Sequence, residues 1–326
     1  MSEGTAEVEV EVAAPRSEAR PRAGMGWWWL VPVLGLLELA LHFLILSHVP
    51  GRDAWARAAA KVNKDWQPGD LVVSAPGWTD PLLRRGFGEN LRLGDAGRAS
   101  LEGYRRIWEL SIRGARADET RGLVPELDME VGGIRVRRYA HKTGTPLANL
   151  VDLLPTATVT RFDKQGREVA CDLVRRTPEG GGLGEGPMKP AARFECDPRR
   201  RWLWVGATVI EDLHYAPRAC IWQRVQGKDP VRVRIDDVPL GDRLALGAGL
   251  YHRHERGGKG TPIHFKVTVG DAAPSKFKHR DGEGWRNYDV AVPAELRGKR
   301  APVTVDVWAK GAKDRGFCWS ALSIAR

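Results

Sequence analysis

Apolar residues follow three patterns in succession along the chain. From Gly26 to Val49 they run almost without interruption for 24 residues. Residues 51–148 combine helical spacing with short apolar strands, and beyond about residue 150 apolar and polar residues alternate in short runs. Because a period of 3.6 residues marks a helix and a period of two marks a half-buried strand, each pattern predicts a different kind of structure.

The first apolar run predicts a membrane-spanning helix. A helix of this length rises about 36 Å, which exceeds a hydrocarbon core of roughly 30 Å. Trp27, Trp28 and Trp29 stand at one end, where indole rings favour the membrane–water boundary. The run is longer than the apolar region of a cleaved signal peptide and ends without an A-x-A-like site. We therefore expect an uncleaved signal anchor over residues 25–50; a buried core helix and a cleaved signal peptide are the alternatives.

The sequence on either side of the run predicts the location. Residues 1–24 contain no aromatic residue, Leu or Ile, so we expect a disordered tail. Arginines flank both ends of the run and do not decide its orientation. All four cysteines follow the run, and an even number favours an oxidising exterior. Arginine outnumbers lysine 38 to 13, as in GC-rich bacterial coding sequences. We expect a cytoplasmic tail, a bacterial inner-membrane anchor, and a periplasmic or extracytoplasmic bulk.

The segment after the run predicts a small α/β domain over residues 51–148. Two helices are expected at its start, with Asp53 and Thr79 as their N-caps. The expected helices are 53–66, 80–85 and 98–106, and the expected strands are 71–74, 107–112 and 133–139. Alternation of helices and strands indicates a mostly parallel sheet.

The remaining residues, 149–326, predict a jelly-roll-like antiparallel β-sandwich, so that the chain as a whole is an anchor helix followed by an α+β protein. Few helices are convincing there, whereas short alternating runs with turns between them recur. The ten expected strands are 158–162, 193–196, 202–210, 219–224, 231–235, 243–250, 263–269, 287–292, 303–309 and 317–324.

Four cysteines lie in the predicted sandwich and allow three disulfide pairings. They are Cys171, Cys196, Cys220 and Cys318. A bond between Cys171 and Cys196 would restrain the glycine-rich loop 179–187 and leave the other two as a second pair. No C-x-x-C motif indicates zinc instead.

The carboxyl edge of the α/β sheet is the first candidate site, because ligands collect there in such sheets. Trp78, Asp80, Arg84 and Arg85 follow the first strand and could form an anion or sugar pocket. The alternative is an ordinary strand-to-helix turn with exposed arginines. No phosphate-binding or nucleophile motif accompanies these residues, and no catalytic residue can be assigned.

The sandwich offers a second candidate, Trp285, which lies in the predicted loop DGEGW and could stack on a sugar. The other tryptophans occupy alternating strand positions and are expected in the core; they are Trp202, Trp204, Trp222, Trp308 and Trp319. His252 and His254 would share one strand face, which could bind a metal, but nearby arginines disfavour a cation. No metal site and no cofactor are therefore expected.

Composition and charge narrow the function classes. With 42% hydrophobic and 28% charged residues, the chain is neither a disordered polymer nor a polytopic membrane protein. The net charge is +10, although residues 1–24 carry five Glu against three Arg. A basic body beside a bilayer favours anionic lipid head groups or acidic envelope polysaccharide as partners. No nucleic-acid-binding signature is present.

Two resemblances extend this interpretation. Residues 68–73, 106–110 and 133–136 resemble the extracytoplasmic domain of polytopic glycosyltransferases that use lipid-linked sugar donors. In that family catalytic carboxylates lie between membrane spans, so a chain with one expected span inherits none. Residues 238–242, 281–285 and 317–321 resemble galactose-binding-domain-like sandwiches, the architecture of many carbohydrate-binding modules. This second resemblance implies sugar binding on loops at one end of the sandwich.

Together these features predict a membrane-anchored extracytoplasmic accessory protein. It would bind glycan or support a membrane glycosyltransferase in the cell envelope, without catalysis of its own. The alternative is an enzyme of envelope glycan or lipid metabolism whose site is the Trp78–Arg85 edge.

Overall fold

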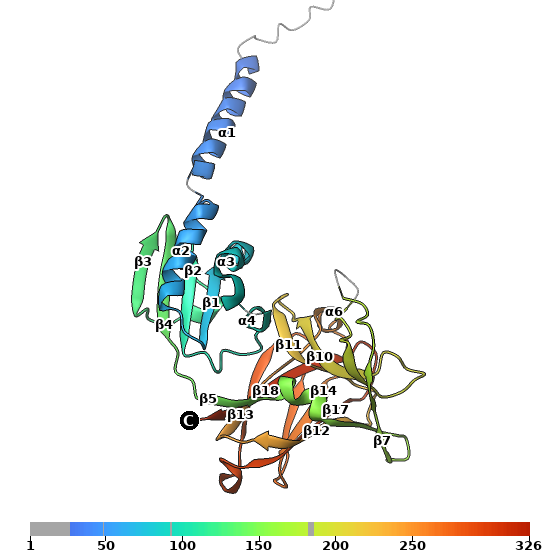
Figure 1. Ribbon diagram of the computed structural model, residues 1–326. Helices are drawn as coiled ribbons and strands as arrows, with labels where there is room; N and C mark the ends of the chain where they lie inside the picture. Colours follow the sequence, from blue (N-terminus) through green and yellow to red (C-terminus); the bar gives the residue numbers. More distant parts are fainter. Residues whose placement is uncertain (1–26, 48, 92, 182–185) are drawn as a thin grey trace, which may run out of the picture. The chain divides into compact units, whose positions relative to one another are not determined.

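The computed structural model describes residues 27–47, 49–91, 93–181 and 186–326, so the tail expected over residues 1–24 lies outside the described residues. The chain divides after Val49 into two compact units, each described by itself. The first unit holds a 3₁₀ turn, Trp27–Trp29, and helix α1, Leu30–Ser47 (Figure 1). Side chains 30–46 of α1 are all exposed. No helix within the described ranges is both long enough and apolar enough to cross a membrane.

The second unit, which starts at Pro50, begins with a four-stranded sheet in the order β1-β2-β4-β3. The elements of this part are α2 (Arg52–Asp65), β1 (Asp70–Ala75), η2 (Gly77–Thr79), α3 (Asp80–Phe87), η3 (Gly88–Asn90), α4 (Leu93–Ala96), β2 (Arg106–Ser111), η4 (Asp118–Thr120), β3 (Leu127–Val131) and β4 (Ile134–Ala140). Strands β1 and β2 are parallel, whereas β4 is antiparallel to both β2 and β3. The expectation of a mostly parallel sheet was wrong, because β3 and β4 form a hairpin instead of a crossover.

Helices α2 and α3 pack on the sheet through apolar side chains at helical spacing. Trp55, Val62 and Phe87 are buried against Trp108 and Val136 of the strands. This small core explains why 14 residues of α2 are helical even though isolated short helices are marginal in water.

The ends of these helices differ from the expected ones. The N-cap of α2 is Gly51, and Asp53 lies inside the first turn, where its charge favours the helix dipole. Thr79 is the N-cap residue of α3, as expected, but its hydroxyl donates to the carbonyl of Pro76 at 2.7 Å and makes no capping bond to the helix. The helix expected over 98–106 was wrong: residues 98–105 form bends and turns, with a φ of 87° at Gly103, and Arg106 begins strand β2.

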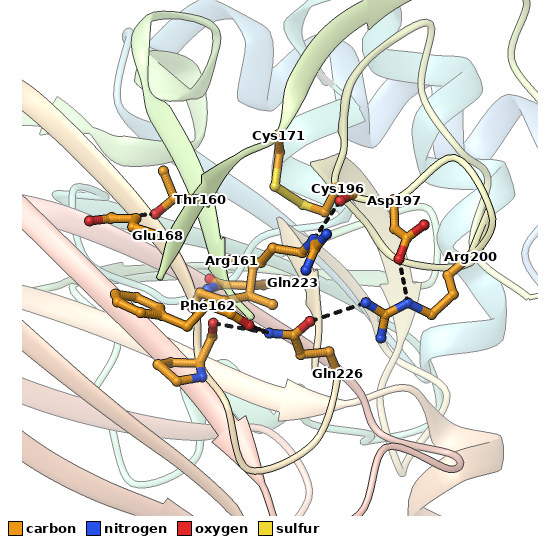
Figure 2. The surroundings of a disulfide bond; sticks show 12 residues. Thr160, Arg161, Phe162, Glu168, Cys171, Cys196, Asp197, Arg200, Gln223 and Gln226 are labelled. Carbon is orange, nitrogen blue, oxygen red and sulfur yellow. Dashed lines mark hydrogen bonds and ion pairs between the residues drawn. A yellow bond between two sulfur atoms is a disulfide. The ribbon is translucent and has the colours of Figure 1, made fainter. Parts of the chain in front are cut away.

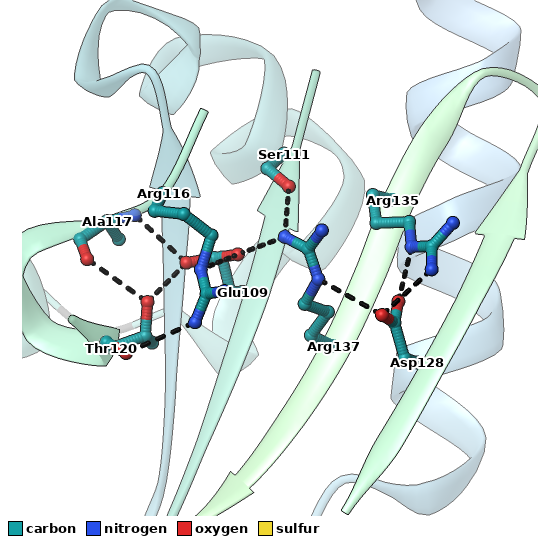
Figure 3. Close-up of polar contacts among 8 residues, drawn as sticks. All are labelled: Glu109, Ser111, Arg116, Ala117, Thr120, Asp128, Arg135 and Arg137. Carbon is teal, nitrogen blue, oxygen red and sulfur yellow. Dashed lines mark hydrogen bonds and ion pairs between the residues drawn. The ribbon is translucent and has the colours of Figure 1, made fainter. Parts of the chain in front are cut away.

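A buried carboxylate joins β2, β4 and the loop after β2. Glu109 of β2 is fully buried, and the Nη1 of Arg137 donates to its Oε1 at 2.8 Å. The backbone N–H of Ala117 and the hydroxyl of Thr120 both donate to Oε2, and Arg116 lies 3.5 Å away (Figure 3). Both carboxylate oxygens are thus satisfied, which compensates the cost of burying the charge.

Two antiparallel sheets form the rest of the second unit. The larger sheet contains β5 (Thr145–Asn149), β8 (Asp172–Arg175), β9 (Ala192–Glu195), β10 (Trp204–Glu211), β11 (Pro217–Arg224), β13 (Arg243–Leu250), β16 (Arg286–Ala291) and β18 (Gly316–Ala325). The smaller sheet contains β6 (Thr158–Phe162), β7 (Glu168–Ala170), β12 (Val231–Pro239), β14 (Ile263–Val269), β15 (Ser275–His279) and β17 (Arg300–Ala309). Short helical pieces are α5 (Leu150–Leu153), η5 (Leu154–Thr156), α6 (His252–Arg256) and η6 (Ala294–Leu296).

The two sheets enclose the largest apolar core, which confirms the β-sandwich. Inward side chains alternate along each strand, as Ile263, Phe265 and Val267 do on β14. From β12 to β18 the chain crosses repeatedly between the sheets, which is the connectivity of a jelly roll. The expected boundary after residue 148 falls inside β5, which pairs with β18. His252 and His254 lie on the short helix α6, so the expectation that they share a strand face was wrong.

Candidate functional site

An aromatic pocket of about 760 Å³ lies against the larger sheet. It is lined by Glu179, Gly186, Pro187, Lys189, Arg199, Arg201, Trp202, Trp204, Trp222, Arg224, Tyr251, Arg253 and His254. We call this site the aromatic pocket. These residues come from the segments between β8 and β9 and between β9 and β10, from strands β10 and β11, and from α6 with the residue before it.

The alternation of β11 places the pocket on the outer face of the sheet. Ile221 points into the core between the sheets, whereas Cys220 and Trp222 belong to a separate buried cluster with Trp204 and Tyr251. Since successive side chains of a strand point to opposite faces, that cluster covers the side of the sheet away from the main core. Of the tryptophans expected in the core, Trp319 lies between the sheets, whereas Trp204 and Trp222 belong to this separate cluster.

Stacked rings form the base of the aromatic pocket. The rings of Trp204 and Trp222 stack with centroids 5.6 Å apart and planes 22° apart. Trp202 is half-buried, and the guanidinium of Arg224 lies 5.0 Å from its ring centroid. Tyr251 is buried beside them. Trp204, Trp222 and Tyr251 are buried, so the half-buried Trp202 supplies the more accessible ring, with charged groups around it. Apolar rings with a few polar groups beside them are usual in a small-molecule site.

One disulfide lies under these rings, and another restrains the margin of the pocket. Cys220 is bonded to Cys318 within the cluster that contains Trp222. Cys171 is bonded to Cys196 and closes the segment between β8 and β9. The expected pairing, in which Cys171 bonds to Cys196 and leaves Cys220 with Cys318, is confirmed.

Polar contacts hold the second disulfide in place. The Nε of Arg161 donates to the carbonyl of Cys196 at 2.8 Å (Figure 2). Arg200 donates to Asp197 at 2.7 Å, and the Nε2 of Gln226 donates to the carbonyl of Phe162 at 2.6 Å. These contacts attach the segment that carries Arg199 and Arg201 to the sandwich.

The aromatic pocket is strongly basic. Among the residues that the structure describes, five cationic side chains and one carboxylate line it. The carboxylate, Glu179, lies 3.3 Å from Lys189, 3.0 Å from Arg193 and 3.3 Å from Arg201. It is therefore already engaged, and the pocket presents a net positive charge to a ligand.

His254 is an uncharged donor at neutral pH. Burial lowers the pKa of His254 to about 4, and the positive charge of Arg224 contributes to the shift. Its Nδ1 accepts the backbone N–H of Gly316 at 3.0 Å. The ring proton consequently resides on Nε2.

The residues predicted at the α/β edge are only partly brought together. Asp80 and Arg84 form an ion pair one turn apart on α3, and both line a cavity of about 440 Å³. Arg85 lines a different cavity, beside α2, and Trp78 is 63% exposed on η2. Ligand binding by these four residues stays a prediction.

Trp285 is half-buried and already has partners. Its indole N–H donates to the carbonyl of Ala99 at 2.6 Å, and the guanidinium of Arg218 lies 5.7 Å from its ring. A Cβ atom on Gly247 would approach the indole to 2.6 Å, so a glycine is needed at this close contact. These contacts occupy the indole N–H and one face of the ring.

The chain matches no protein-family model, and no curated protein is similar to it. Similar solved structures include CBM51-2 with GlcNAc and INT domains of Clostridium perfringens ZmpB, at 11% identity and a TM-score of 0.28; the match covers 52% of this chain and 37% of that one. Another is CBM51 of C. perfringens GH95 with methyl-galactose, at 11% identity, a TM-score of 0.24, and 51% and 79% coverage.

A third similar structure is TmCBM61 with β-1,4-galactotriose, at 13% identity and a TM-score of 0.19, which covers 33% of this chain and 68% of that one. Because these scores are low, the β-sandwich assignment rests on the strand pairing itself. The resemblance of the first soluble segment to a glycosyltransferase domain stays a prediction.

Proposed function

We propose that this protein binds glycan in the aromatic pocket of its β-sandwich and acts as a non-catalytic accessory of the cell envelope. The observation that carries the proposal is the stack of Trp204 and Trp222 beside the half-buried ring of Trp202, surrounded by cationic side chains. Sugars present apolar C–H faces together with hydroxyl groups, and such ligands suit an aromatic surface with polar groups at its margin.

We also propose that residues 25–50 tether this glycan-binding unit to a membrane. Side chains of α1 such as Leu36, Phe43 and Ile45 are 66%, 62% and 56% exposed. Apolar side chains on every face of a helix favour an apolar environment over water. Two disulfides agree with an oxidising compartment for the sandwich. A tether of this kind would place the pocket beside a membrane glycosyltransferase or its product. Extraction of membranes with alkaline carbonate tests this part; release of the intact protein into the soluble fraction would contradict it.

Glycan binding is tested with the purified full-length protein on an array of envelope polysaccharides and oligosaccharides. Trp202→Ala should raise the dissociation constant about tenfold or abolish binding, because it removes an aromatic ring of the pocket. Trp308→Ala is the matched control: Trp308 is also half-buried, but it stacks on His264 of the smaller sheet, 5.7 Å between centroids, and does not line the pocket. Equal binding by both variants, or no binding by the wild type, would refute the proposal.

The alternative function, an enzyme at the Trp78–Arg85 edge, has weaker support. The charged groups in that cavity neutralise one another: Asp80 pairs with Arg84, and Glu119 pairs with Arg98. Turnover of a lipid-linked or envelope glycan that is lost in Asp80→Ala, with glycan binding intact, would favour the enzyme.

A further inference from the structure

The polar groups of the aromatic pocket that lack partners are all donors. The side chain of Arg224 has no ion pair and no hydrogen bond within the described part of the chain, and its Nε is buried. The indole N–H of Trp222, a side chain only 2% exposed, also lacks an acceptor there. A buried donor without an acceptor costs free energy, most of all when it is charged.

Within the described ranges, no carboxylate forms an ion pair with Arg224. Glu179, the only carboxylate among the described lining residues, is held by Lys189, Arg193 and Arg201. Burial lowers the pKa of Arg224, and the negative charge of Asp314 opposes this only in part. Arg232 is also half-buried, but its guanidinium forms an ion pair with Asp306 at 2.7 Å.

The orientation of Arg224 suits a planar anion. Its guanidinium lies over the ring of Trp202, 5.0 Å from the centroid. A guanidinium stacked on a ring keeps its in-plane N–H groups available, and this fork matches two oxygens of a carboxylate or a phosphate. His254 adds a neutral Nε2 donor; its nearest carboxylate, Asp314, is 3.9 Å away and 57% exposed.

We propose that the aromatic pocket selects acidic glycans, and that Arg224 binds the carboxylate or phosphate group of the bound sugar. This inference rests on the proposed glycan-binding function and adds the chemical class of the ligand. The half-buried ring of Trp202 would contact the body of the sugar, while the donors of Arg224 and His254 face its acidic group. A neutral sugar would leave the guanidinium desolvated and unpaired, which is the physical basis of the selectivity.

The test uses pairs of ligands that differ only in the acidic group. Uronic-acid oligosaccharides are compared with their carboxyl-reduced forms, and phosphorylated oligosaccharides with their dephosphorylated forms, by titration against the full-length protein. We expect at least one acidic ligand to bind, and its neutral form to bind about tenfold more weakly or worse. The arm that responds identifies the acidic group as carboxylate or phosphate.

Arg224→Gln should remove this preference, while Arg224→Lys, which keeps the charge but loses the fork, should retain part of it. Arg234→Gln is the matched control, because Arg234 pairs with Asp236 on the smaller sheet and does not line the aromatic pocket. The melting temperature of Arg224→Gln should not fall, since a desolvated charge is removed.

Three results distinguish failure of the acidic-ligand preference from failure of glycan binding itself. Equal binding of acidic and neutral forms, sensitive to Trp202→Ala, would overturn the inference and leave glycan binding standing. An acidic preference that persists in Arg224→Gln would overturn the assignment of Arg224. Absence of any glycan binding would overturn both.

Discussion

Removal of the Cys220–Cys318 disulfide should destabilise the protein more than removal of Cys171–Cys196. The first bond closes a loop of 98 residues and the second a loop of 25. In the chain-entropy description, a disulfide restricts the unfolded chain in proportion to the logarithm of the loop length. It thus contributes about 4.7 kcal/mol for the longer loop and about 3.5 kcal/mol for the shorter one at 25 °C.

In each of two variants, both cysteines of one disulfide are replaced by alanine. Urea unfolding is then monitored by intrinsic fluorescence. Both variants should unfold at lower urea concentration. Their free energies of unfolding should differ by about 1 kcal/mol, with Cys220→Ala/Cys318→Ala the less stable. This variant should also weaken glycan binding, because its bond packs in the cluster of Trp204 and Trp222. Equal stabilities, or the opposite order, would refute the loop-length reasoning.

Three further predictions concern buried polar groups. Gln223→Leu removes the acceptor of the Trp319 indole N–H, which lies 2.6 Å from Gln223 Oε1, and should cost about 1–3 kcal/mol in urea unfolding; an unchanged midpoint would contradict this. Glu109→Gln removes the buried carboxylate that lies 2.8 Å from Arg137 and leaves that guanidinium with Asp128 alone, 3.4 Å away. It should cost about 3 kcal/mol, measured in the same way; a cost below that of Gln223→Leu would contradict it. His254 has a folded pKa of about 4 against an ordinary 6.5, so the protein loses stability as the pH falls from 6.5 toward 4, by at most about 1.4 kcal/mol per pH unit. His254→Gln should reduce the dependence of the free energy of unfolding on pH in this window. An unaltered slope would contradict the assignment.

The strands that the sequence predicted well are those that bury one face between the sheets. Alternation along Ile263–Val269 and the apolar run of Arg243–Leu250 match β14 and β13 residue for residue. The strands that were missed, such as Glu168–Ala170 and Asp172–Arg175, bury little of their own surface. They are formed by pairing with a neighbour, which local patterning does not record.

The candidate site was harder to predict, because alternation reveals a covered face but not what covers it. Trp204 and Trp222 have the spacing of core residues, and Trp319 of the same pattern does lie in the core between the sheets. A signal was present on β11, where Cys220, Trp222 and Arg224 share one face: a charged residue in line with buried ones marks an opening rather than a core. Trp285, chosen for its loop, donates its indole N–H to Ala99, and sugar binding by its ring stays a prediction.

The most direct test of the central claim is to map where a bound glycan touches the protein. The oligosaccharide that binds best is equipped with a photoreactive group and cross-linked to the full-length protein, and the adducts are located by mass spectrometry. Binding in the aromatic pocket predicts adducts on the peptides that contain Trp202, Trp222 and His254. Adducts confined to the peptides around Trp78 or Trp285 would contradict it.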